Sequence, residues 1–115
     1  MNDKTYYIYI LRCQDNSLYT GITTDVKRRF LEHSGKGNLG AKYTRSKRPQ
    51  HVEAVWSCHS RACASKLEYA FKHLTKENKE KIVSDAFLLN TLLSDKLDTS
   101  KYLYLSEYKD YKLNL

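Results

Sequence analysis

The sequence lacks several features that would place the protein in a specialised class. No apolar run is long enough to cross a bilayer, and the N-terminal residues show no secretory signal pattern. The three cysteines cannot all pair within the chain, which favours a reducing compartment over a secreted disulfide scaffold. Internal repeats and low-complexity linkers are also absent from the sequence. We therefore expect a cytoplasmic protein that does not associate with membranes.

Charge is distributed unevenly along the 115 residues, whose net charge is +7. Residues 1–84 contain 16 Lys or Arg and 8 Asp or Glu, whereas residues 85–115 contain 4 and 5. The length favours a single core. The change in charge suggests a domain over 1–84 and a C-terminal extension over 85–115, packed on or beside it. This acidic, tyrosine-containing extension could dock a protein partner.

The segment 27–48 concentrates the positive charge, with eight basic residues against one acidic residue. Such a cluster suggests a polyanion as the partner, because neutralising phosphates releases counterions. A solvated basic surface that keeps the protein soluble is an almost equal alternative on charge alone.

Local patterns predict both strands and helices. Aromatic and β-branched runs predict strands, and Asp and Asn between the first two runs indicate a turn. Ser, Thr or Asp caps followed by apolar residues at helical spacing indicate helices. The predicted strands cover 6–13, 18–22, 52–58 and, from a weaker alternation, 101–108. The predicted helices cover 25–33, a segment from Ser60 or Ser65 to 74, 75–83 and 85–97.

The first predicted helix carries charge on its inward face. Helical spacing aligns Val26, Arg29, Phe30 and His33. Arg29 and His33 are unexpected there, because burying a charge without a partner is costly. Arg28 points elsewhere and should be solvated. Alternatively, Arg29 and His33 border the core and pair with a carboxylate.

The second predicted helix has the same anomaly at Glu68, which falls on its inward stripe with Leu67 and Phe71. Glu68 could form a capping box with Ser65 or an i,i+4 ion pair with Lys72. Each alternative is individually as well supported as a role in catalysis. The coincidence of charge on two inward stripes in a basic chain favours a functional site.

Tyr9 and Tyr19 complete this set of polar residues. The two rings share one face of the predicted hairpin in one register, but not in the register shifted by one residue. The sequence does not fix the register, and tyrosine also packs well in strands without any other role. Cys58, His59, Cys63 and His73 offer ligand atoms for zinc, but their spacing matches no common finger, so we do not expect structural zinc.

The ordered motifs resemble those of the GIY-YIG nuclease family, and most closely its small stand-alone members related to the N-terminal nuclease domain of the DNA-repair excinuclease. The resemblance covers the first two-thirds of the chain. Tyr7 stands where the first motif has glycine, and Thr20 stands where the second has isoleucine. The matching segments are Tyr7 to Cys13, Ser17 to Asp25, Arg28 with Arg29, His33, Gly40 to Arg45, and Arg48 with Pro49.

This resemblance implies a small three-stranded antiparallel sheet flanked by helices, and hydrolysis of DNA with one divalent cation, Mg²⁺ or Mn²⁺. Glu68 would bind the metal, and Tyr9 would act as general base or orient the attacking water. Arg29 would neutralise charge on the scissile phosphate, while Tyr19 and His33 would position phosphate or water.

The basic segment is expected to bind the nucleic-acid backbone. Its candidate contact residues are Arg28, Lys36, Lys42, Tyr43, Arg45, Lys47 and Arg48. We expect a metal-dependent endonuclease of low sequence specificity, on duplex, branched or single-stranded DNA. The alternatives are a nucleic-acid-binding adaptor without catalysis and a nuclease subunit that a partner targets.

Overall fold

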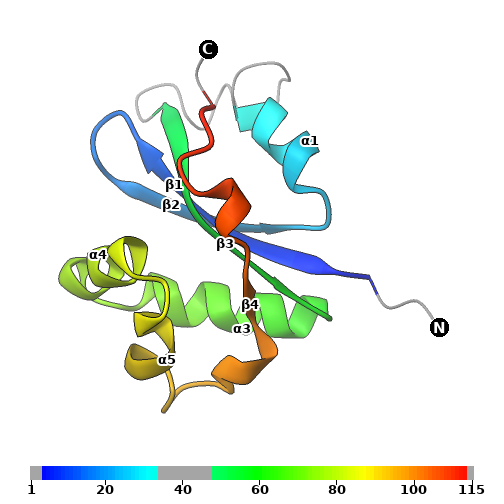
Figure 1. Cartoon of the computed structure of the whole chain (residues 1–115), viewed down its shortest axis with the longest axis vertical. Helices are drawn as coiled ribbons and strands as arrows, with labels where there is room; N and C mark the ends of the chain where they lie inside the picture. The colour runs from blue at the N-terminus through cyan, green and yellow to red at the C-terminus, as the bar shows by residue number, and fades with distance from the viewer. Residues whose placement is uncertain (1–3, 34–47, 114–115) are drawn as a thin grey trace.

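A computed structural model describes residues 4–33 and 48–113 of the chain. Four antiparallel strands form one sheet in the order β2-β1-β3-β4, with helices on both faces (Figure 1). The strands are β1 (Tyr6–Cys13), β2 (Leu18–Thr23), β3 (Pro49–Cys58) and β4 (Leu103–Tyr104). The helices are α1 (Val26–Leu31), α3 (Arg61–Lys72), α4 (Lys76–Ser84) and α5 (Leu88–Leu92), with short 3-10 turns at Thr99–Lys101 and Ser106–Tyr108. The predicted α+β fold is confirmed.

The β1–β2 turn fixes the hairpin register. Asn16 adopts a left-handed conformation with φ of 70°, and the Asp15 carboxylate accepts a hydrogen bond from the Ser17 backbone N–H at 3.0 Å. Tyr9 then pairs with Gly21. In this register Tyr19, opposite Leu11, lies on the same face of the sheet as Tyr9.

Each face of the sheet carries its own apolar core. One core joins β1 and β3 to α1 through Tyr9, Phe30 and Val55. The other joins the opposite face to α3 and α5 through Ile8, Ile10, Leu67, Phe71, Leu89 and Leu93. Alternate residues of β1 therefore point to different layers, and α1 and α3 lie on opposite sides of the sheet (Figure 1).

The caps of the predicted helices are partly confirmed. Asp25 caps α1, and its carboxylate accepts from the Arg28 backbone N–H at 3.1 Å. The cap of α3 is Ser60, which accepts from the Cys63 N–H, so the capping box of Ser65 with Glu68 is wrong. Thr75 caps α4.

The region after residue 84 departs most from the sequence prediction. The helix expected over 85–97 is reduced to α5, because the Asp85 carboxylate accepts from the Phe87 N–H and holds a turn there. The strand expected over 101–108 is limited to β4, which pairs Tyr104 with Trp56. This short strand makes the sheet four-stranded rather than three-stranded.

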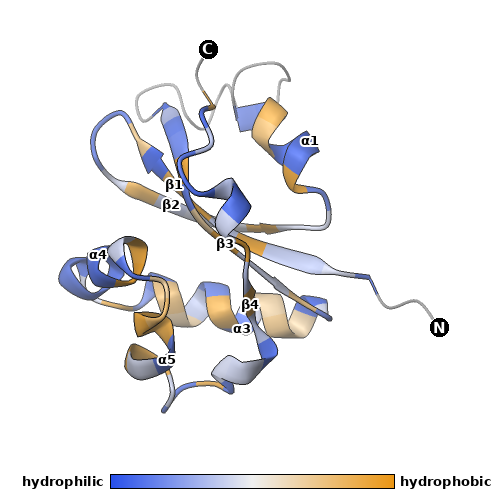
Figure 2. Ribbon diagram, in the orientation of Figure 1, coloured by the Kyte–Doolittle hydropathy of each residue, from blue (hydrophilic) through white to orange (hydrophobic). Residues whose placement is uncertain are grey.

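Hydropathy follows these layers. α4 is largely hydrophilic and α5 largely hydrophobic (Figure 2). Among the described helices, none combines the length and apolar character needed to span a membrane.

A buried carboxylate, Glu53 on β3, links sequence-distant parts of the chain. It accepts from Arg12 Nε at 2.8 Å and from Lys109 Nζ at 2.9 Å, and only 6 % of the residue is exposed. Arg12 also forms a two-pronged ion pair with Glu80 on α4, with both distances 2.7 Å. Burial opposes ionisation of Glu53, but Lys109 and Arg12 outweigh it and lower its pKa.

Candidate active site

Three polar side chains meet on the α1 face of the sheet. The Tyr9 hydroxyl accepts a hydrogen bond from Arg29 Nε at 3.1 Å and lies 3.1 Å from His33 Nε2. The structure brings together Tyr9 from β1, Arg29 from α1 and His33 from the turn that follows it. Val26 and Phe30 on the same helix are buried, as the inward stripe predicts. The helical spacing therefore places two polar groups over the Tyr9 ring.

Gly21 leaves room for this arrangement. A Cβ atom built on Gly21 would lie 2.5 Å from the Tyr9 hydroxyl oxygen and 2.7 Å from its Cζ atom. Such distances are too short for non-bonded contact, so any side chain at residue 21 would displace the Tyr9 ring. The glycine of the second motif thus has a direct physical role.

We expect Gly21→Ala to destabilise the protein by about 1–3 kcal/mol, the usual effect of overpacking a closely packed site. Chemical denaturation of the wild type, both single variants and the double variant with Tyr9→Leu would measure it. Removing the Tyr9 ring should largely suppress the effect of Gly21→Ala. Equal effects of Gly21→Ala in both backgrounds would contradict the steric explanation.

His33 is held neutral in this cluster. Burial, followed by the nearby Arg29 charge, lowers its pKa to about 4. A neutral ring whose Nε2 accepts from the Tyr9 hydroxyl carries its proton on Nδ1. That Nδ1 atom is buried and has no hydrogen-bond partner within residues 4–33 and 48–113. A buried donor of this kind is costly to leave unpaired, so a phosphate oxygen or water at this position would stabilise the site.

The depressed His33 pKa makes stability depend on pH. Between about pH 6.5 and pH 4 the unfolded chain binds a proton at His33 that the folded chain does not, so stability should fall as pH falls through this window. The loss should be on the order of 2–3 kcal/mol. Urea unfolding of wild type and His33→Gln at several pH values isolates this contribution. Parallel pH dependences of the two proteins would show that His33 titrates normally.

Arg29 and Tyr19 face the same cluster with different exposure. Arg29 Nη1 pairs with Glu32 at 2.7 Å, which satisfies the predicted carboxylate pairing, and 27 % of its side chain is exposed. Burial opposes its charge, but Glu32 and the Tyr9 oxygen outweigh this and raise the Arg29 pKa. The half-buried Tyr19 ring lies 5.2 Å from the His33 ring and 6.2 Å from the Tyr9 ring, between centroids. Arg28 is 60 % exposed, as expected for a solvated residue.

Tyr9 itself is fully buried. Its burial, followed by the proximity of Tyr19, raises its pKa, and the Arg29 charge offsets this only in part. The phenol therefore keeps its proton at neutral pH. This favours a role in orienting neighbouring groups over a role as general base.

Glu68 lies apart from this cluster, on α3 and therefore on the other side of the sheet. Its carboxylate forms an ion pair with Lys72 one turn later, at 3.3 Å, and 24 % of its side chain is exposed. The i,i+4 alternative is thus observed. α3 packs against β2, the edge strand that also carries Tyr19. A ligand that contacts both Glu68 and the Tyr9 cluster would have to cross the β2 edge.

Most of the predicted basic segment lies outside the described residues, namely Lys36, Lys42, Tyr43, Arg45 and Lys47. Arg48 is described and exposed, and its backbone carbonyl accepts from the Gln14 N–H at 2.7 Å. This bond joins the start of β3 to the β1–β2 turn.

A second group of potential metal ligands was not apparent in the sequence. Oxygen and nitrogen atoms of His51, Glu53 and Asp110 lie within 4.8 Å of one another. Both Glu53 oxygens already accept from cations, Arg12 and Lys109, so the group fits a buried ion-pair network better than a metal site. No sequence spacing pointed to it, because its members are brought together only by the β3 contacts with the C-terminal segment.

Comparison with known proteins places these features in a family. The model of the GIY-YIG catalytic domain matches residues 5–81, a span that contains both tyrosine motifs, Arg29, His33 and Glu68. The chain belongs to the GIY-YIG family.

Its GIY-YIG relatives include uncharacterised proteins of similar size. UPF0213 protein BH0048 of Halalkalibacterium halodurans is 50 % identical over 80 residues, covering 69 % of this chain and 82 % of that protein. UPF0213 protein FN1575 of Fusobacterium nucleatum is 45 % identical over 86 residues, covering 72 % and 83 %. The solution structure of BH0048 aligns with a TM-score of 0.47 at 43 % identity, over 81 % of this chain and 99 % of that one.

Proposed function

We propose that the protein is a metal-dependent endonuclease that hydrolyses DNA phosphodiester bonds with low sequence specificity. The match to the GIY-YIG catalytic domain supports nuclease chemistry. The observation that carries the proposal is the Arg29–Tyr9–His33 cluster, which holds a partly exposed cation beside an unpaired buried N–H donor. Both groups suit the oxygens of a phosphodiester.

Arg29 is the proposed phosphate ligand. Its Nε and Nη1 atoms are engaged by Tyr9 and Glu32, which fixes the plane of the guanidinium while leaving the side chain partly exposed. A cation oriented before the substrate arrives stabilises charge that develops on the phosphate in the transition state. Tyr9 is the residue that orients Arg29 and His33, and Tyr19 is proposed to position phosphate or water.

Glu68 is the proposed metal ligand. Its partly exposed carboxylate fits a hard cation that takes one protein oxygen and completes its shell with waters and substrate phosphate. The pair with Lys72 is on the helix surface and is weak enough to exchange for a metal ion. When bound, Mg²⁺ or Mn²⁺ would polarise the phosphate and stabilise the leaving oxygen.

This assignment makes a demand on substrate shape. Because Glu68 and Arg29 belong to opposite faces of the sheet, the scissile phosphate must lie at the β2 edge to be reached from both. The proposed backbone contacts of the segment 36–48 follow α1 in the chain. A bound strand would then run over β2 from the α1 face to the α3 face.

Cleavage of labelled single-stranded, duplex and branched DNA, with Mg²⁺, Mn²⁺ or EDTA, tests the function. Arg29→Lys keeps the charge but loses the planar fork, so we expect its cleavage rate to fall by roughly 10²- to 10³-fold. Arg61→Lys, at an exposed arginine that begins α3, is the matched control and should cleave as wild type. Metal-independent cleavage, or a normal rate for Arg29→Lys, would refute the assignment. DNA binding without any cleavage would instead support the adaptor alternative.

A further inference from the structure

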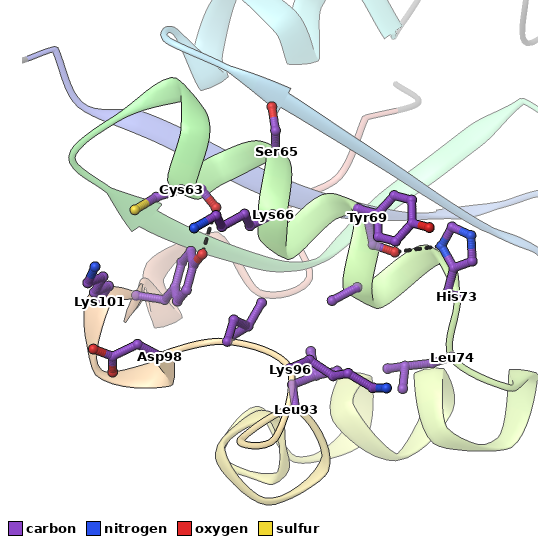
Figure 3. Close-up of a pocket in the computed structure, with 13 residues that line it drawn as sticks. Cys63, Ser65, Lys66, Tyr69, His73, Leu74, Leu93, Lys96, Asp98 and Lys101 are labelled. Carbon is purple, nitrogen blue, oxygen red and sulfur yellow. Dashed lines mark hydrogen bonds between the residues drawn. The ribbon is translucent and has the colours of Figure 1, made fainter.

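A groove distant from the Tyr9 cluster lies between α3 and the C-terminal segment that follows α5 (Figure 3). Its volume is about 750 Å³, within the usual range for ligand pockets. One wall is α3, and the other is formed by residues 93–102. The GIY-YIG match ends at residue 81, so half of this groove is built from chain outside the matched segment.

The groove is preformed. The Tyr102 hydroxyl donates to the Cys63 carbonyl oxygen at 2.6 Å and joins the two walls at one end (Figure 3). Leu93 is anchored in the α3-side core with 1 % of the residue exposed. A ligand would therefore meet walls that are already in place, which lowers the cost of ordering on binding.

The lining combines an apolar floor with positive charge. Ala70, Leu74, Leu93 and Leu97 are the apolar lining residues. Three lysines, Lys66, Lys96 and Lys101, face one carboxylate, Asp98, whose oxygen already accepts from the Ser100 N–H at 3.1 Å and Oγ at 2.6 Å. The groove thus favours an anion that also has an apolar body.

An exposed aromatic pair stands at one end of this groove. The Tyr69 and His73 rings stack with centroids 4.0 Å apart and an interplanar angle of 27°. A hydrogen bond between His73 Nδ1 and the Tyr69 carbonyl oxygen, at 2.8 Å, holds them in place (Figure 3). Tyr69 nevertheless remains 67 % exposed. Ordered, exposed rings beside lysines form the combination with which proteins stack nucleic-acid bases.

We propose that this groove binds a nucleotide unit, with its base stacked on Tyr69 and its phosphate beside the lysines. A planar base uses the aromatic pair, which an acidic peptide without rings would leave exposed. Tyr69 follows Glu68 directly on α3, about 100° around the helix axis. A single strand held in the groove would therefore run past Glu68, so the proposal rests on the proposed nuclease function and deepens it by assigning single-stranded DNA a second contact.

Binding in EDTA tests the groove separately from cleavage. Fluorescence anisotropy with a labelled oligothymidylate should show Tyr69→Leu weakening binding by roughly 5- to 150-fold, the value of one stacked base. Lys96→Gln with Lys101→Gln should weaken binding and reduce the log–log salt slope by about 0.7 for each lost phosphate contact.

Two matched controls should bind as wild type. Phe87→Leu removes an aromatic residue that is 73 % exposed and lies outside the groove lining. Lys76→Gln with Lys81→Gln neutralises two exposed lysines of α4, whose side chains are 73 % and 51 % exposed. A loss of affinity in the controls equal to that of the groove variants would reduce the effect to general surface charge and overturn the proposal.

Amide shift mapping with thymidine monophosphate, thymidine and inorganic phosphate identifies the source of the nucleotide. Shifts at the groove with the monophosphate indicate a free nucleotide, and shifts only with the oligonucleotide indicate a single strand; both support the groove. Unchanged affinity of Tyr69→Leu, or equal shifts with inorganic phosphate alone, would overturn it. If these variants lose binding but the wild type cleaves no DNA, the groove stands and the nuclease proposal fails.

Discussion

Glu68→Ala is expected to abolish metal-dependent cleavage, with a rate loss of at least about 10³-fold. The substitution removes the proposed metal ligand. It leaves the fold intact, because the partner it loses, Lys72, is on the helix surface with half of its side chain exposed. Cleavage rates measured over a range of Mg²⁺ and Mn²⁺ concentrations, with circular dichroism to check folding, give the comparison.

Glu77→Ala is the matched control for this experiment. Glu77 forms the same kind of i,i+4 pair on α4, with Lys81 at 3.5 Å, and its side chain is 78 % exposed. Its loss should leave cleavage unchanged. Wild-type cleavage by Glu68→Ala would remove Glu68 from the site and leave the metal without an assigned ligand.

Tyr9→Phe is expected to reduce both cleavage and stability. Cleavage should fall by roughly 10²- to 10⁴-fold, because Arg29 and His33 lose the hydroxyl that orients them. Stability should fall by about 1–3 kcal/mol, since a buried acceptor for Arg29 Nε and a buried partner for His33 Nε2 are removed together. Single-turnover cleavage and urea unfolding measure the two effects.

Tyr104→Phe provides the comparison for Tyr9→Phe. The Tyr104 ring packs on Trp56 at a centroid distance of 5.7 Å, and that packing survives the substitution. Near-normal cleavage by Tyr9→Phe together with lost stability would mean that Tyr9 is a structural residue only. Near-normal values of both would mean that its hydroxyl does not hold Arg29 in solution.

The side of the site nearest in sequence was predictable. A helical period of 3.6 places Arg29 and His33 on the buried side with Val26 and Phe30, and the structure confirms this for a helix of only six residues. The turn chemistry of Asp15 and Asn16 supplied the hairpin, although the choice of register needed the full set of β1 and β3 contacts.

Features that depend on distant segments were not predictable. The sequence suggested a site-facing Tyr9 hydroxyl of little value to stability, whereas the structure buries it completely. It also suggested that Glu68 faces the same basic and phenolic groups as Arg29, whereas α1 and α3 lie on opposite sides of the sheet. Periodicity reports which side of a helix is buried, but not which face of the sheet covers it.

The Glu53 network has a consequence for how the molecule assembles. Lys109 Nζ bridges Glu53 on β3 and the Val83 carbonyl oxygen at the end of α4, at 2.9 and 3.1 Å. Tyr108 and Tyr111 pack on Phe30 of α1 at centroid distances of 5.9 and 5.4 Å. During synthesis on the ribosome, the Tyr9 layer and the Glu53 charge therefore cannot reach their final state until residues 108–113 have emerged. Contacts of such long sequence separation slow folding, so the nascent chain should acquire activity only late in its synthesis.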